Sequence, residues 1–281
     1  MAEVATFATS DQLLVVIDPA ARHTDGESVR IAKDVLSAGA ATKVCLPEGP
    51  EEFARALARR GSRRPVVVGD DRALLRAVSL LHRRRELAGC ALSVVPVGAA
   101  LSLAGALGIP TGAVAAARAV LDGVERRLDL LVDDSDGVVL GTLRIPPIPP
   151  TGRSPEPMDG RPWLRTYQSL VRTLVPPRPA PALSGPGPAR LRVEVDGVTL
   201  IDLDQPVEGI SVIPHGSGTA SIEVRPSSVG AEAAPLLARG RRVTVSGADF
   251  RYRADAMEAG PVRRRTWTVW EGGLGLTLPS S

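Results

Sequence analysis

The strongest fold signal in the chain is PVVVGDDRALLRAV, Pro65 to Val78. It begins with a valine run, turns at Gly69, and continues with apolar residues at helical spacing. A strand, a glycine turn and a helix in this order are the usual scaffold for binding a nucleotide phosphate. A phosphate-binding turn favours several glycines and little negative charge, but this turn has one glycine followed by two aspartates. The stretch predicts an α/β fold and leaves open whether the turn binds a nucleotide.

The flanking sequence continues the alternation of strands and helices. Short apolar runs are typical of buried parallel strands, and the stretches between them have helical spacing. The expected strands are Leu13–Ile17, Thr42–Leu46, Val66–Val68 and Leu92–Val95, and the expected helices are Ser28–Leu36, Glu51–Arg60, Arg72–Leu87, Ala99–Leu107 and Thr111–Leu121. We therefore predict an α/β N-terminal domain with a doubly wound parallel sheet over residues 1–132.

The remainder of the chain has a different pattern. Leu128–Val132 and Val138–Ile145 read as strands joined by an acidic turn, and later short runs alternate apolar and polar residues. Such alternation between turn residues is typical of antiparallel sheets. Proline-rich connectors are expected within 146–188, flanking a helix at 163–174. The sequence thus predicts a C-terminal antiparallel β-sandwich domain over residues 133–281.

Composition excludes several classes of function. The 281 residues are 44% hydrophobic and 23% charged, with a net charge of +3, which is ordinary for a globular protein and gives no nucleic-acid footprint. The two cysteines and three histidines are scattered, so neither a metal site built from cysteine or histidine nor a histidine-based catalytic triad is expected.

Neither secretion nor a transmembrane segment is expected. The N-terminus has no basic start and no apolar signal core. Leu87 to Ala117 contains no charged residue, but prolines and glycines interrupt it, so it reads as buried strands, turns and helices. We expect a cytoplasmic protein, with peripheral attachment to the membrane left open.

Three segments follow the first, third and fourth expected strands: IDPAAR (17–22), VGDDR (68–72) and PVGAALSLAGALGIP (96–110). In their order they resemble the three glycine-rich landmarks of the bacterial diacylglycerol kinase family of lipid kinases. LRVEVDG (191–197) and YRADAMEAGPVRRRTWTV (252–269) are similar to the family's sandwich strands and its late Asp-Gly-Glu segment.

The resemblance implies ATP-dependent phosphorylation of a lipid hydroxyl with Mg²⁺. It assigns nucleotide binding to Gly69, Asp70, Arg72 and Gly98, and catalytic roles to Asp70 and Glu258. The metal ligands stay unassigned, although Asp70 could hold a metal that bridges phosphates. The implied partner is a lipid substrate or an anionic membrane surface, and a homodimer is compatible with the family.

The departures from the family pattern support a second hypothesis. In VGDDR, a valine, an aspartate and an arginine replace a glycine, a glycine and a threonine, and Ala99–Ser102 replaces Thr-Gly-Asn-Asp. Asp18 stands for an asparagine, and no acidic metal loop is found between Glu208 and Arg241. Phosphoryl transfer depends on positioning and charge stabilisation, so losing these groups predicts reduced or lost activity. The alternative is a catalytically inactive binding or regulatory protein that retains the fold, and a third is an unrelated nucleotide-binding protein.

Two groups of charged residues have both a structural and a functional interpretation. Asp70 and Asp71 could simply stabilise the start of a helix, by roughly 0.3–2 kcal/mol through capping and the helix dipole. In the functional interpretation the turn retains a nucleotide role: Asp71 adds a second negative charge close to where phosphate oxygens would lie, and Arg72 could offset it. Arginines cluster at Arg59–Arg64, Arg83–Arg85 and Arg263–Arg265. They would favour an anionic membrane, or they are solvated helix ends and strand edges.

Overall fold

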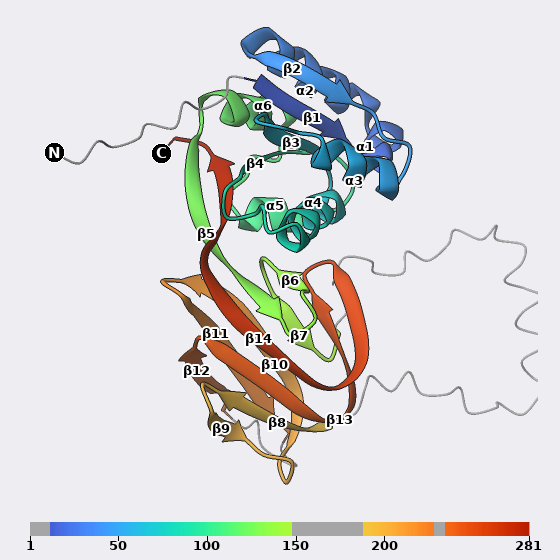
Figure 1. The fold of residues 1–281 in the computed structure, drawn as a ribbon. Helices are drawn as coiled ribbons and strands as arrows, with labels where there is room; N and C mark the ends of the chain where they lie inside the picture. Colours follow the sequence, from blue (N-terminus) through green and yellow to red (C-terminus); the bar gives the residue numbers. More distant parts are fainter. Residues whose placement is uncertain (1–11, 148–187, 228–233, 281) are drawn as a thin grey trace, which may run out of the picture.

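The protein has an α/β half and a strand-rich half that are joined by two long strands (Figure 1). The computed structural model describes residues 12–147, 188–227 and 234–280. The helix expected at 163–174 and most of the proline-rich stretch lie outside the described residues. None of the helices in the described ranges has the length and apolar character needed to cross a bilayer.

Four parallel strands form the centre of the α/β half. Their order is β2 (Ala41–Cys45), β1 (Gln12–Ile17), β3 (Arg64–Gly69) and β4 (Ala91–Pro96), and all three pairings are parallel. All four of the strands predicted here are thus present. β2 follows β1 in the chain and lies on one side of it, whereas β3 and β4 lie on the other side, so the strand order reverses at β1. In open α/β sheets, ligands bind beyond the carboxyl ends of the strands at such a reversal.

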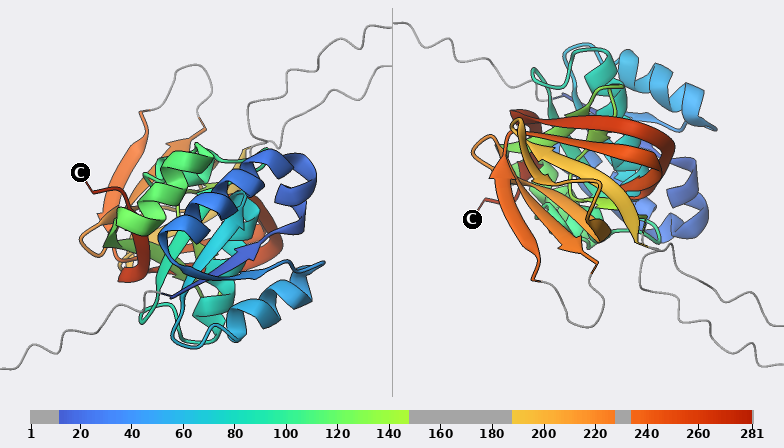
Figure 2. Two further views of the ribbon diagram at one scale, coloured as in Figure 1. Left: turned by 90° about the horizontal axis from the view of Figure 1, so that it is seen from above. Right: turned by 90° about the horizontal axis from the view of Figure 1, so that it is seen from below.

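Helices cover both faces of these strands, and the burial pattern explains why. Successive side chains of a strand point to opposite faces, so a run of apolar residues must be covered twice. Figure 2 shows α2 and α6 side by side on one face, where they enclose a core with Leu13, Val15 and Val66. Leu14 and Val67 point to the other face, which α3 and α4 cover. The helices are α1 (Pro19–Thr24), α2 (Gly26–Gly39), α3 (Pro50–Ala58), α4 (Asp71–Arg83), α5 (Ser102–Ala106) and α6 (Ala113–Asp122).

The strand-rich half is antiparallel around a separate apolar core. Alternating inward side chains of its strands, Trp267 among them, make up that core. The strands are β5 (Val124–Asp133), β6 (Val138–Val139), β7 (Leu143–Ile145), β8 (Ala189–Val195), β9 (Val198–Ile201), β10 (Pro206–Gly216), β11 (Thr219–Pro226), β12 (Leu236–Gly240), β13 (Arg242–Ala254) and β14 (Met257–Leu278). The predicted antiparallel C-terminal sheet is confirmed. The sandwich arrangement, and the doubly wound assignment of the N-terminal half, stay predictions.

The strand β14 connects the two halves, which the sequence patterns did not predict. Its first part pairs with β13, and its last part lies parallel to β4, with Leu276 opposite Leu92. β5 runs antiparallel alongside β14 in both halves (Figure 1). A methyl group on Gly123 would lie 2.4 Å from the carbonyl oxygen of Leu278, so only glycine allows the close approach where α6 meets the end of β14. The boundary expected at residue 132 stays a prediction, and it falls within β5.

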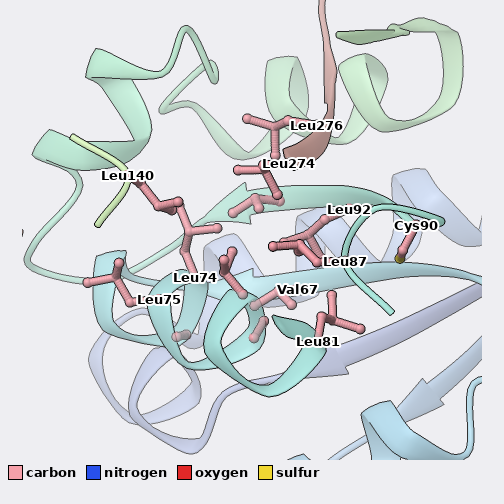
Figure 3. Close-up of a cluster of buried hydrophobic side chains, with 14 of the residues drawn as sticks. Val67, Leu74, Leu75, Leu81, Leu87, Cys90, Leu92, Leu140, Leu274 and Leu276 are labelled. Carbon is pink, nitrogen blue, oxygen red and sulfur yellow. The ribbon is translucent and has the colours of Figure 1, made fainter. Parts of the chain in front are cut away.

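Side chains from both halves share one core. Figure 3 shows Leu140, Leu274 and Leu276 in the same cluster as Leu74 and Leu92. All five side chains are buried. This common core holds the C-terminal half against α4 and β4, and so fixes the β13–β14 hairpin relative to the edge of the parallel sheet.

Candidate functional site

Three of the residues predicted to bind nucleotide meet at the carboxyl ends of β1, β3 and β4. A methyl group on Gly69 would lie 2.6 Å from Cβ of Ala73 and 3.0 Å from Cβ of Asp18, so Gly69 allows β1 and α4 to approach closely. Gly98 has a φ of +136°, and a methyl group there would lie 3.0 Å from Cβ of Asp70. The structure therefore brings together Gly69, Asp70 and Gly98, at the place where an α/β sheet binds its ligand.

Asp70 caps the first turn of α4. Its Oδ1 accepts the N–H groups of Arg72 at 3.0 Å and of Ala73 at 3.1 Å, and its backbone carbonyl accepts the N–H of Leu74 at 3.1 Å. This is the usual N-cap geometry, in which a short side chain satisfies helix donors that lack intrahelical acceptors. Asp70 therefore supplies the acceptor that the N–H groups of Arg72 and Ala73 would otherwise lack.

Asp71 is the residue whose role the sequence predicted least well. Its carboxylate was expected near phosphate oxygens, but the side chain is 2% exposed and points toward α5. Its oxygens accept the N–H groups of Leu103 at 2.9 Å and Ala104 at 3.0 Å, and the hydroxyl of Ser102 at 3.2 Å. Its own N–H donates to the carbonyl of Ala100 at 2.8 Å. Asp71 thus caps α5 from a neighbouring helix and completes the set of bonded N–H groups in the first turn of α4.

Asp18 and Arg76 form a further internal pair at this edge. Asp18 is buried, and its Oδ1 accepts the N–H of Ala20 at 2.9 Å to cap α1. Its Oδ2 lies 2.5 Å from Nη1 of Arg76, whose guanidinium is 5.5 Å from the ring centre of Phe53. The Asp18 carboxylate and the Arg76 guanidinium are therefore both bonded inside the protein.

Arg72 remains at the surface beside these residues. Its side chain is exposed and no carboxylate in the described part of the chain pairs with it, although its N–H bonds to Asp70. Of the residues predicted to bind nucleotide, Arg72 is the one whose side chain the structure leaves without an internal partner.

Glu258 lies in the β13–β14 hairpin. The register pairs Ala254 with Met257 and Arg253 with Glu258. Glu258 is 51% exposed and pairs with Arg253 at 3.5 Å, and no hydrogen bond or ion pair in the described ranges joins it to Asp70 or Gly98. The role predicted for Glu258 stays a prediction, and the contact that the structure gives this side chain is its ion pair with Arg253.

The hairpin turn can be compared with the Asp-Gly-Glu segment that the resemblance implies, if Asp255 is matched to its aspartate. Because Ala254 pairs with Met257, the turn consists of Asp255 and Ala256. Counting from Asp255, the third residue of the Asp-Gly-Glu pattern is Met257. Adjacent side chains of a strand point to opposite faces, so Glu258 does not replace that glutamate sterically.

Asp255 is the buried carboxylate of this hairpin. It accepts the N–H groups of Leu140 at 2.7 Å and of Gly141 and Thr142 at 2.8 Å each. Burial raises the pKa of Asp255 above its ordinary value, the three N–H groups oppose that rise, and the nearby charge of Asp71 adds to it. Asp255 therefore anchors the hairpin to the β6–β7 segment, and it has no oxygen without a hydrogen bond.

Few carboxylates at this edge are available to a magnesium–nucleotide group, and Asp70 accepts its two backbone hydrogen bonds through Oδ1 alone. Mg²⁺ bound to phosphates needs carboxylate oxygens that face the ligand. Among the residues the structure describes, no group of three acidic, histidine or cysteine side chains is placed to hold a metal. The carboxylates of Asp18, Asp71 and Asp255 are instead bonded to the protein.

A comparison with protein families agrees with this architecture. Residues 12–132 match the model of the diacylglycerol kinase catalytic domain. This segment belongs to that family. The match covers β1 to nearly the end of β5, including the carboxyl edge described above. The resemblance inferred from the order of the landmarks is thus confirmed.

Solved structures of diacylglycerol kinase relatives share the fold of the whole chain. Three structures from Bacillus anthracis str. Sterne, described as a diacylglycerol kinase or as a candidate for one, match with TM-scores of 0.66–0.67. Each match covers 95% of this chain and 97% of the other, at 12% sequence identity. At that identity the likeness shows the fold alone. No curated protein matches the chain.

Proposed function

We propose that this protein is a non-catalytic member of the diacylglycerol kinase fold, which acts by binding and not by phosphoryl transfer from ATP. The observation that carries the proposal is the hydrogen bonding around Asp70 and Asp71. Each N–H group in the first turn of α4 has an internal acceptor, and the buried carboxylate of Asp71 caps α5. A phosphate brought to this edge would meet the carboxylate of Asp70 and no unbonded N–H group in the first turn of α4.

The hairpin supports the same proposal from the substrate side. A general base must lie within hydrogen-bonding reach of the hydroxyl that it deprotonates. With Asp255 matched to the family's aspartate, Met257 stands at the family's glutamate position, and Glu258 is bonded to Arg253. We infer that Asp70 and Glu258 have structural roles here, in place of the catalytic roles that the resemblance implies.

The test is a calorimetric titration of the full chain with Mg²⁺–ATP. We expect no saturable heat at micromolar to low millimolar nucleotide. A parallel thermal melt should show no shift, whereas a ligand present at 100 times its Kd would stabilise the fold by about 2.7 kcal/mol. Saturable, magnesium-dependent binding with a micromolar Kd would overturn the proposal.

A second function, residual ATP-dependent phosphorylation of a lipid, is favoured by the convergence of Gly69, Asp70 and Gly98. Incubating the protein with labelled ATP, Mg²⁺ and a lipid extract distinguishes the two. We expect no labelled lipid. Labelled lipid that depends on the protein, and disappears with Asp70→Ala, would establish this second function and contradict the first.

A further inference from the structure

The amino ends of the parallel strands carry a cluster of arginines that the kinase fold does not explain. We call the side chains of Arg59, Arg60, Arg63, Arg83, Arg84 and Arg85 the amino-edge arginine cluster. The first three lie between α3 and the start of β3, and the others end α4, before β4. β3 and β4 are adjacent parallel strands, so the two connections leave the same edge of the sheet.

Ion pairs confirm that the two connections are in contact. Glu86 pairs with Arg60 from one connection and with Arg84 from the other, at 2.9 Å for Arg84. These arginines hold the pKa of Glu86 below its ordinary value, chiefly through the hydrogen bond from Arg60. Glu86 therefore neutralises part of the cluster and fixes the two loops together.

The rest of the cluster has no neutralising partner. Arg59, Arg83 and Arg85 are exposed, and no carboxylate in the described ranges lies within ion-pair distance of them. The guanidinium of Arg63 donates to the carbonyl of Arg60 at 3.4 Å, which leaves its charge unpaired. The edge thus presents several uncompensated guanidinium groups, although the net charge of the chain is only +3.

The backbone at Arg85 is a second feature of this edge, and Asp136, Asp196, Ser217 and Asp255 elsewhere in the chain also have a positive φ. Arg85 has a φ of +58° at the end of α4. Its N–H bonds to the carbonyl of His82 at 2.8 Å, and that of Glu86 bonds to the carbonyl of Leu81 at 2.9 Å. This is the Schellman geometry, in which the left-handed position strongly favours glycine. An arginine at the position best suited to glycine adds strain, and such strain is typically retained at functional sites.

From this cluster and the strained Arg85 we infer that the amino edge docks onto an anionic phospholipid bilayer. Guanidinium groups form paired hydrogen bonds with phosphate oxygens, and several of them on one edge can contact many headgroups at once. Nucleic acid fits less well, because the ring of His82, next to Arg83, is mostly buried against Trp270 and is not available for bases to stack on. The cluster also extends over two loops and a helix end, and not along one helix that could enter a groove.

The inference goes beyond the proposed function and is independent of nucleotide. The parallel strands of six residues separate the two edges by roughly 20 Å, at about 3.3 Å per residue. A bilayer bound at the amino edge therefore lies away from the carboxyl edge that holds Asp70 and Gly98. Docking at this edge would tether the protein to the bilayer without placing lipid near the turn that contains Gly69 and Asp70.

The test is co-sedimentation of the full chain with vesicles, without nucleotide. We expect binding to phosphatidylcholine vesicles that contain phosphatidylglycerol, no binding to phosphatidylcholine alone, and weakening as salt is raised. Each basic residue near an anionic surface contributes about a five-fold change in affinity, so the triple variant Arg59→Ala, Arg83→Ala, Arg85→Ala should bind about a hundred-fold more weakly.

A charge-matched control uses Arg239→Ala with Arg251→Ala and Arg264→Ala, three exposed arginines of β12, β13 and β14 in the other half. We expect this variant to keep wild-type binding. Equal losses in both variants, or no vesicle binding by the wild type, would overturn the inference. So would tighter binding to duplex DNA or RNA than to the anionic vesicles at the same salt. None of these outcomes bears on Mg²⁺–ATP binding, which is measured separately.

Discussion

The two edges of the parallel sheet differ in how their charged residues are used. At the carboxyl edge, Asp18, Asp70 and Asp71 are bonded to helix N–H groups or to Arg76. At the amino edge, exposed arginines have no carboxylate partner in the described part of the chain. The carboxyl edge has the position of a kinase site, but its carboxylates serve the fold and its exposed charge is that of Arg72, whereas the amino edge has several arginines available to a partner. A charged residue therefore indicates function only when the structure leaves it without an internal role.

The largest expected effect comes from Asp71→Ala at the carboxyl edge. The change leaves the buried N–H groups of Leu103 and Ala104 without an acceptor, so we expect a loss of about 3 kcal/mol in the free energy of unfolding. Urea denaturation measures it as a lower midpoint with an unchanged slope. A loss below about 0.5 kcal/mol, within the range of ordinary surface substitutions, would mean that Asp71 is not a structural cap.

The next prediction concerns the pH dependence that Asp255 contributes. Its pKa is raised in the folded protein above the ordinary value of 3.8, so folding takes up a proton between these two pKa values. Asp255 therefore contributes most to stability below pH 3.8, and this contribution is lost as the pH rises through the pKa of the folded protein. The total loss is about 1.4 kcal/mol for every pH unit that separates the two pKa values. Denaturation of wild type and of Asp255→Asn over this pH range measures the effect. The free energy of unfolding of wild type minus that of Asp255→Asn should fall as the pH rises.

Asp202→Asn serves as a control, because the contribution of Asp202 to stability should change with pH in the opposite direction. The hydrogen bond from Arg192 lowers the pKa of Asp202, so its contribution is present above its ordinary pKa and is lost as the pH falls. A wild-type advantage over Asp255→Asn that grows with pH, as expected for Asp202, would contradict the assignment for Asp255.

A smaller effect is expected for Asp70→Ala. Asp70 caps α4 through two backbone N–H groups near the surface, and the loss of such a cap costs about 1 kcal/mol. Asp70→Ser keeps a capping oxygen and should regain most of that loss in the same denaturation experiment. If Asp70→Ser is as unstable as Asp70→Ala, the carboxylate has a role other than capping.

The smallest effect, of opposite sign, is expected at the amino edge. Arg85→Gly places glycine in the left-handed position and should stabilise the protein by about 0.5–1 kcal/mol. Arg85→Ala removes the same charge but retains the strain, so its thermal melting temperature should stay close to that of wild type. Equal melting temperatures for the two variants would mean that the backbone at Arg85 is not strained.

The alternation of strands and helices, and the family, could be predicted from the sequence alone. The apolar runs Leu13–Ile17 and Val66–Val68 are strands because a sheet covered on both faces needs continuous apolar residues. The order of the three landmarks was enough for the resemblance that the match over residues 12–132 confirms. These properties depend on local composition and spacing, which can be read along one chain.

The roles of the polar residues became clear only from the folded chain. Sequence position suggested that Asp71 adds charge near a phosphate, but its partners Leu103 and Ala104 are some thirty residues away in sequence. The end of α4 was predicted at Leu87, whereas the helix ends at Arg83, because no glycine marks the left-handed residue. The pairing of β14 with β4 joins segments almost two hundred residues apart. Hydrogen-bond partners and strand neighbours depend on contacts distant in sequence, so residue type and spacing cannot specify them.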